Sequence, residues 1–343
     1  MRRIKFIFLR TYMRIGLFFY MKSIRFHGIQ HIPTDKPTLI LCNHQNALIE
    51  ALILAVNLPK YGYFLTRASV FKIAWISRFL KGIKMLPVYR IRDGWHNLEN
   101  NKSIFHECVD ILSKNEILVL FPEGSHNLVR RVRPLSKGFT RIVFEFFETH
   151  PNREIQLVPV GLNFRDATAY VDELHVYVGT PIPYKLKADQ TRHQQVTQMK
   201  SEVHMALTRL TTHIPETNYS EDLLKLKSKH VNFLDPISVN RCIESDFKDC
   251  ESMPKSRLEP FRAILKTILK IVMFLPYAVW KLLVKPRIKE PEFIATFRFA
   301  VAVILAPIYL IILTLFLGLI LSWSLALIIL TSILIIALLT VKL

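Results

Sequence analysis

The chain has 343 residues, of which 51% are hydrophobic, and it contains only 10 glycines and 18 prolines. This composition excludes a disordered or collagen-like chain, and the length suits one catalytic-size domain with appended segments. The formal net charge of +19 attracts nucleic acid, anionic lipid or phosphorylated substrates, and charge alone does not separate these classes. The hydrophobicity favours a membrane partner.

The four cysteines, Cys42, Cys108, Cys242 and Cys250, form neither a Cys-x-x-Cys pair nor a dense framework. We therefore expect reduced thiols or small buried apolar side chains. This cysteine usage fits a protein that faces the cytosol.

Residues 1–24 combine basic and aromatic side chains. Arg3, Arg10 and Arg14 share one helical face, and phenylalanine and leucine residues supply apolar bulk around it. Arg14 and Lys22 interrupt the place where a secretory signal peptide needs its cleavage site. The pattern predicts a retained helix at the membrane interface, with an ordinary core helix as the alternative.

The middle of the chain alternates between strand and helix patterns. Short apolar runs predict strands at 38–42, 61–66, 116–121, 155–160 and 174–178. Helical patterns lie at 46–57, 69–80, 97–114, 136–150 and 193–213. This order predicts an α/β domain over residues 25–215, with a mostly parallel sheet, flanking helices and 174–178 as a candidate antiparallel addition.

Residues 216–258 are charged and weakly periodic, which predicts a polar linker. Residues 259–290 place five basic side chains in one arc of an apolar helix, and their longest uncharged run is too short to span a bilayer. We expect a basic amphipathic segment that lies on the membrane surface.

No charged residue occurs from Phe299 to Val341. One straight helix of this length would be roughly twice as long as the ~30 Å hydrocarbon core, so residues 297–342 predict two transmembrane helices with a turn near 318–324. Basic residues flank both outer ends, so the positive-inside rule predicts an integral membrane protein with both ends of the hairpin and the soluble domain on the cytoplasmic face. A buried core hairpin is the alternative.

Two polar strings follow predicted strands. The first strand runs into Asn-His-Gln-Asn-Ala-Leu-Ile-Glu at 43–50, and the 116–121 strand ends in Phe-Pro-Glu-Gly-Ser at 121–125. Sites of open α/β sheets lie beyond the carboxyl ends of strands. His44 followed by Glu50 indicates a base oriented by an acid, in which one ring nitrogen takes a proton from a hydroxyl. A helix-capping role for His44 is the alternative.

These two strings resemble the first and third sequence blocks of the glycerolipid acyltransferase family, whose membrane enzymes acylate glycerol phosphate, lysophosphatidate and related lysolipids. Residues 82–90, Gly-Ile-Lys-Met-Leu-Pro-Val-Tyr-Arg, resemble the second block, and residues 158–161, Val-Pro-Val-Gly, resemble the fourth. Four blocks in family order identify the chain as a member of this family.

The resemblance implies roles for individual residues. His44 and Glu50 are the expected catalytic residues, and Arg90 is expected to contact the acceptor phosphate through its planar fork. Glu123 and Gly124 are expected to shape the acceptor site. The further substrate-binding candidates are Asn43 and Ser125.

The first block departs from the usual family pattern. Five residues separate His44 from Glu50, where the usual block has four before an aspartate; a branch reading Asn-His-Pro-Asn-x-x-x-Asp shares the longer spacing but differs at Gln45 and Glu50. An extra residue turns the acid by about 100° on an ideal helix. The longer glutamate side chain or a non-helical start must absorb this turn.

The expected function is that of a membrane-bound O-acyltransferase acting on lysophosphatidate, with acyl-CoA or acyl carrier protein as donor and no metal or cofactor. The phospholipid membrane is the other expected partner. The alternatives are a glycerol 3-phosphate or other lysophospholipid acceptor, a lipid or thioester hydrolase, and a non-enzymatic lipid-binding protein. The chain lacks Gly-x-Ser-x-Gly, which disfavours a serine hydrolase, and lacks nucleic-acid-binding motifs.

A basic group follows the third block. Arg130, Arg131, Arg133 and Lys137 are expected either to meet phosphates of coenzyme A, acyl carrier protein or the bilayer, or to form a solvated charged loop.

Overall fold

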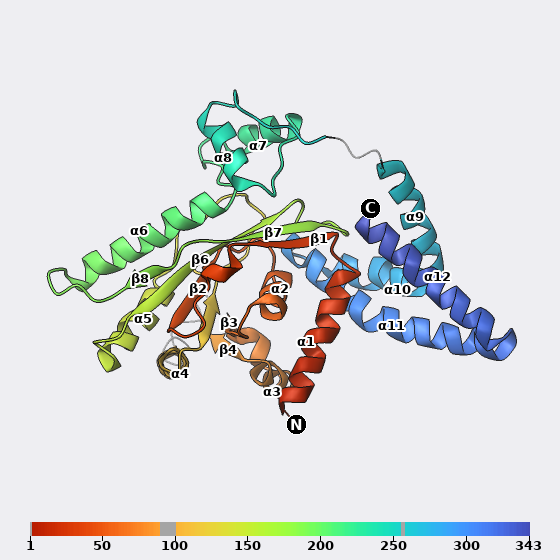
Figure 1. Cartoon of the computed structure of the whole chain (residues 1–343), viewed down its shortest axis with the longest axis horizontal. Helices are drawn as coiled ribbons and strands as arrows, with labels where there is room; N and C mark the ends of the chain where they lie inside the picture. The colour runs from red at the N-terminus through yellow and green to blue at the C-terminus, as the bar shows by residue number, and fades with distance from the viewer. Residues whose placement is uncertain (1, 90–100, 255–257) are drawn as a thin grey trace.

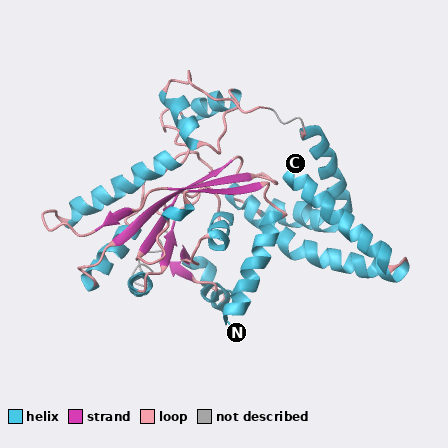
Figure 2. Cartoon of the chain, in the orientation of Figure 1, coloured by secondary structure: helices cyan, strands magenta, loops and turns pink. Residues whose placement is uncertain are grey.

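The computed structural model describes residues 2–89, 101–254 and 258–343, with helices packed around one eight-stranded sheet (Figures 1 and 2). The strand order is β1-β7-β6-β2-β5-β3-β4, and β8 pairs with β6. The strands are β1 Ser23–His27, β2 Thr38–Cys42, β3 Tyr63–Arg67, β4 Met85–Val88, β5 Ile117–Leu120, β6 Ile155–Phe164, β7 Glu173–Val178 and β8 Ile182–Tyr184.

The sheet is mostly parallel, which confirms the predicted fold class. Only β7 and β8 run antiparallel to their neighbour β6, as expected for the run at 174–178, while the other pairings within the described residues are parallel. β2 and β6 lie in the interior of the sheet, and every residue of both is buried. Burial on both faces explains why their sequences are nearly continuous apolar runs.

Helices cover both faces of the sheet. Alternate residues of β2 point to opposite sides, so Ile40 and Cys42 share a core with α1 and α2, while Leu39 and Leu41 share a core with α4, α5 and α6. The bounds are α1 Arg2–Phe18, α2 Ile49–Asn57, α3 Ala74–Gly82, α4 Asn101–Ser113, α5 Gly138–Thr149 and α6 Arg192–Leu210, with 3-10 turns η1 Ile29–His31 and η2 Ala68–Phe71.

Two arginines of α1 donate hydrogen bonds to the end of α2. Arg10 donates to the carbonyl oxygens of Val56 (3.0 Å) and Leu58 (2.8 Å), and Arg14 also donates to Val56. These carbonyls end α2, where the helix dipole favours a cation. The described apolar residues Ile7, Phe8, Ile15 and Phe18 remain exposed.

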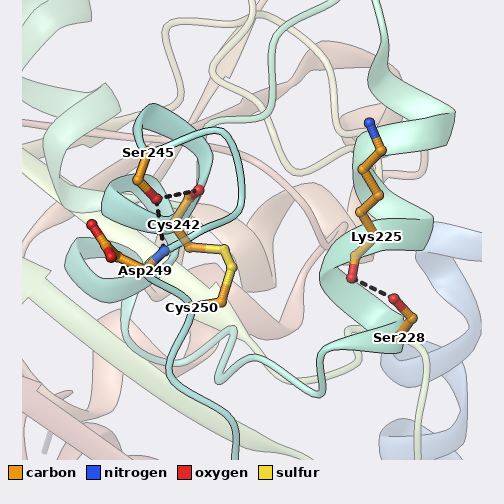
Figure 3. The surroundings of a disulfide bond; sticks show 6 residues. All are labelled: Lys225, Ser228, Cys242, Ser245, Asp249 and Cys250. Atoms are coloured by element: carbon orange, nitrogen blue, oxygen red, sulfur yellow. Dashed lines mark hydrogen bonds between the residues drawn. A yellow bond between two sulfur atoms is a disulfide. The ribbon is translucent and has the colours of Figure 1, made fainter.

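The predicted polar linker contains two helices, α7 Tyr219–Ser228 and α8 Pro236–Glu244, with a small apolar core of their own. Cys242 at the end of α8 forms a disulfide with Cys250, with their Cα atoms 4.6 Å apart (Figure 3). The expectation of reduced thiols is therefore wrong for this pair, and cysteine usage no longer argues for a protein that faces the cytosol. The chain reverses through left-handed Asp246 and Phe247, which carries Cys250 back to α8. Cys42 and Cys108 are free and buried, as expected.

The C-terminal region begins with a bent pair of helical segments. The first part is α9 Glu259–Val272. The second part consists of α10 Phe274–Ala278, π-helical η5 Val279–Val284 and 3-10 η6 Lys285–Arg287. The two parts are bent by 96° relative to each other. The single helical arc expected over 259–290 is thus broken near Met273. Pro276 lies just after the break, where its missing N–H and fixed φ disfavour a continuous helix.

After the 3-10 turn η7 Pro291–Phe293, α11 Ile294–Ile320 and α12 Trp323–Lys342 form the predicted hairpin (Figure 1). Both helices are long and apolar enough to cross a membrane, and their turn falls within the predicted range 318–324. Lys342 donates to the carbonyl oxygen of Met21 (2.9 Å), so the last turn of α12 returns to the α/β domain.

Candidate active site

The site lies beyond the carboxyl ends of β2 and β5, which are neighbours in the sheet. Residues 43–48 form a non-helical loop between β2 and α2, and Leu48 is the N-cap of α2. His44 Nδ1 lies 2.8 Å from Glu50 Oε2. The histidine side chain therefore pairs with the carboxylate, and the helix-capping alternative does not describe it.

Glu50 is completely buried in the first turn of α2. Its Oε1 accepts the backbone N–H groups of Gln45 (2.9 Å) and Asn46 (2.6 Å). The loop thus wraps around the carboxylate, and its non-helical path absorbs the extra residue of the first block. Burial raises the pKa of Glu50, whereas the two amides act in the opposite direction by favouring the ionised form.

The imidazole of His44 contacts two other rings. It stacks on Phe121 with ring centroids 4.1 Å apart and meets the His126 ring edge-on at 5.7 Å. Its side chain is 14% exposed, whereas that of Glu50 is fully buried. Burial, together with the neighbouring His44, lowers the pKa of His126 to about 4, so this second imidazole is neutral at pH 7.

The 121–125 loop is fixed by Arg133. The guanidinium donates to Glu123 Oε2 (2.6 Å) and to Ser125 Oγ (2.7 Å), and also bonds the Ser125 carbonyl. Burial raises the pKa of Glu123 to about 7, against the opposing charge of Arg133. Its second oxygen, Oε1, is buried without a hydrogen-bond partner among the described residues. Gly124 has φ +72°, a conformation that favours glycine.

One of the expected substrate-binding residues, Asn43, bonds to the scaffold. The Asn43 amide donates to the Leu162 carbonyl (3.0 Å) and accepts the Leu162 N–H (2.7 Å), so it ties the end of β2 to β6. It is 4% exposed, and its observed bonds serve the scaffold. Arg90 lies outside the residues that the structure describes.

Three of the basic residues after the third block bond within the protein. Arg130 donates to the carbonyls of Phe164 (2.9 Å) and Arg165 (2.6 Å), and burial lowers its pKa to about 10. Arg131 pairs with Glu216 at 2.9 Å, and Arg133 holds the 121–125 loop. These contacts match neither the expected phosphate ligands nor a solvated loop. Lys137 lines a cavity of about 320 Å³ between α5 and α6.

Sequence reasoning missed the residues that approach the site from the C-terminal region. His126 Nε2 lies 3.0 Å from Glu290 Oε2, and the Phe293 ring meets His126 edge-on at 4.8 Å. His126 directly follows the third block, so its position offered a signal, whereas Glu290 and Phe293 carry none. Within the described ranges, no three His, Cys, Asp or Glu side chains are grouped to hold a metal.

The family model described as acyltransferase matches residues 23–163, which contain β1 to β5 and most of β6. The 1-acyl-sn-glycerol-3-phosphate acyltransferase of Bacillus subtilis (strain 168) is 25% identical over 121 residues, 35% of this chain and 56% of that protein. The chain thus covers little more than half of that relative.

A crystal structure of the 1-acyl-sn-glycerophosphate (LPA) acyltransferase PlsC from Thermotoga maritima matches 60% of this chain and 81% of that one, with a TM-score of 0.40 and 13% identity. Residues 23–163 are an acyltransferase domain. The family model and the Bacillus subtilis relative support the glycerolipid acyltransferase family that the four sequence blocks led us to expect.

Proposed function

We propose that the chain is a membrane-bound O-acyltransferase that transfers a fatty acyl group from acyl-CoA or acyl carrier protein to lysophosphatidate. The observation that carries this proposal is the buried His44–Glu50 pair, held 2.8 Å apart beside the 121–125 loop within the acyltransferase domain. The activity named for the Bacillus subtilis relative supports this acceptor.

In the proposed reaction, Glu50 accepts the Nδ1–H of His44 and fixes the tautomer that leaves Nε2 as the base. Nε2 takes the proton of the acceptor hydroxyl as its oxygen attacks the thioester carbonyl. The carbon–sulfur bond then breaks, and the leaving thiolate recovers the proton from the imidazolium. An ester and a thiol result, without an acyl-enzyme.

The proposed acceptor site lies along the 121–125 loop. Glu123 has a buried oxygen without a described partner, and its pKa of about 7 allows the protonated acid to donate to a substrate oxygen. Gly124 leaves open space where a Cβ would project. Arg90 remains the proposed ligand of the acceptor phosphate, since its fork suits two phosphate oxygens.

The membrane arrangement completes the proposal. α11 and α12 anchor the chain, and the exposed apolar residues of α9 and α10, among them Phe261, Ile264 and Phe274, rest on the bilayer surface. Basic residues at the outer ends of the hairpin favour a cytoplasmic catalytic domain. A lipid acceptor then reaches His44 without leaving the membrane surface.

The test is an acyl-acceptor screen with the purified full chain in detergent. Radiolabelled acyl-CoA and acyl carrier protein thioesters are each offered lysophosphatidate, glycerol 3-phosphate, lysophosphatidylcholine or no acceptor. We expect labelled phosphatidate only with lysophosphatidate. Acylation of another acceptor would show that lysophosphatidate is the wrong acceptor. Fatty acid release without acceptor would indicate a hydrolase, and no turnover with any thioester would contradict the proposal.

A further inference from the structure

The start of the C-terminal hairpin contacts the loop that carries His44. We call residues 290–298 the entry segment. The Ala47 N–H donates to the Glu292 carbonyl (3.4 Å), and the Leu48 N–H donates to the Thr296 hydroxyl (3.2 Å). The same hydroxyl donates to Asn46 Oδ1 (3.2 Å).

These bonds complete the hydrogen bonding of the loop. Four successive amides, those of residues 45–48, precede α2 and have no partner in the backbone hydrogen bonds of the helix. Glu50 accepts the first two, and the entry segment accepts the last two. The Asn46 side chain, fully buried, is held from the other side by donation to the Ala167 carbonyl (2.8 Å).

The entry segment is itself fixed independently of the loop. Arg298 donates to the Tyr20 hydroxyl (2.9 Å) and to the Thr168 carbonyl (2.8 Å). Tyr20 in turn donates to the Ala295 carbonyl at 3.1 Å. The first turn of α11 is therefore bonded both to the chain that precedes β1 and β7 and to the His44 loop.

We propose that Thr296 is a positioning residue for the His44–Glu50 pair, so that the membrane hairpin completes the active-site loop. This inference rests on the proposed function for the role of the pair, and on the hydrogen bonds alone for the coupling. Glu50 reaches His44 only because residues 45–48 follow a non-helical path around its carboxylate. Removing the Thr296 hydroxyl takes the acceptor from the Leu48 N–H and a donor from the buried Asn46 side chain, so the loop loses two bonds that hold its path.

The experiment uses the full chain reconstituted in phosphatidylcholine and phosphatidylglycerol vesicles. Thr296→Val removes the hydroxyl at nearly constant volume, and Thr296→Ser retains it. Thr314→Val is the matched control, because among the described residues the Thr314 hydroxyl donates to the Leu310 carbonyl of its own helix and to no other group. We expect Thr296→Val to lower kcat about tenfold or more at nearly constant KM, with Thr296→Ser and Thr314→Val close to wild type.

Hydrogen–deuterium exchange of the peptide that spans residues 43–50 provides a readout that does not need activity. We expect faster exchange there in Thr296→Val alone, with β6 unchanged. Unchanged exchange, an equal loss in Thr296→Ser, or faster exchange throughout the domain would overturn the positioning role. A wild-type chain without acyl transfer would contradict the proposed function, while the exchange result would still decide the coupling.

Discussion

Glu50 pairs with His44 across a spacing one residue longer than the usual family block. On an ideal helix the extra residue would turn the carboxylate away by about 100°. The turn does not occur because α2 begins only at Ile49 and the preceding loop donates two amides to Glu50. The backbone of residues 45–48 therefore preserves the contact between His44 and Glu50.

The role of Glu50 is tested by Glu50→Gln. The amide keeps the size of the side chain, but its NH₂ group cannot accept the Nδ1–H of His44 while its oxygen serves the two backbone amides. We expect kcat to fall by about 10²–10⁴-fold with little change in the acceptor KM. Steady-state kinetics measure both values, and a fully active variant would make the carboxylate a bystander.

Glu123 makes stability depend on pH in a definite direction. Its folded pKa of about 7 exceeds the ordinary value of 4.5, so between these values the folded state binds the proton that the unfolded state has lost. The wild type should therefore lose stability, relative to Glu123→Gln, as pH rises from about 4.5 to 7, by on the order of 1–3 kcal/mol. Melting of both proteins in detergent at several pH values measures this, and parallel curves would contradict it.

At the scale of elements, the sequence pattern is most informative for the buried interior of the sheet. The run at 38–42 predicts β2 residue for residue, because burial on both faces requires continuous apolar side chains. β1, β4 and β8 are missed, since they are short strands of three to five residues with partly exposed or proline-containing sequences. The pattern of residues 259–290 gives the apolar and basic faces but not the bend at Met273.

Contacts between distant elements leave no local pattern. Thr296 bonds Asn46 across 250 residues, and His126 pairs with Glu290 across 164. The His44–Glu50 pair was predicted because both residues lie in one recognisable block, whereas the entry segment carries no motif that names its partner. Only packing of the hairpin against the domain brings these residues together.

The α7–α8 unit provides a prediction about covalent structure. Cys242 and Cys250 should resist alkylation in denaturant without reductant, while Cys42 and Cys108 react. Changing both Cys242 and Cys250 to serine should destabilise the unit by about 2 kcal/mol, the low end for a disulfide, because the closed loop is short. Mass spectrometry counts the alkylated thiols, and four labelled cysteines in the wild type would contradict the pairing.

Across the whole molecule, the α11–α12 hairpin contacts the α/β domain and α1 at several places. α1 packs against α11, where Gly16 allows close approach to Val303, and Tyr12 donates to the Val303 carbonyl. The entry segment reaches the His44 loop, and Lys342 returns to Met21. The proposed membrane anchor is thus continuous with the catalytic loop, which fits an enzyme whose acceptor and product are lipids.

The most direct test of the central claim compares the wild type with His44→Ala in reconstituted vesicles, with radiolabelled acyl thioester and lysophosphatidate. We expect the wild type to form labelled phosphatidate. We expect kcat of His44→Ala to fall by about 10²–10⁴-fold, because the acceptor hydroxyl loses its base. Membrane association and melting temperature serve as controls and should stay near wild type. Turnover of His44→Ala within about tenfold of wild type would remove His44 from the reaction and contradict the account.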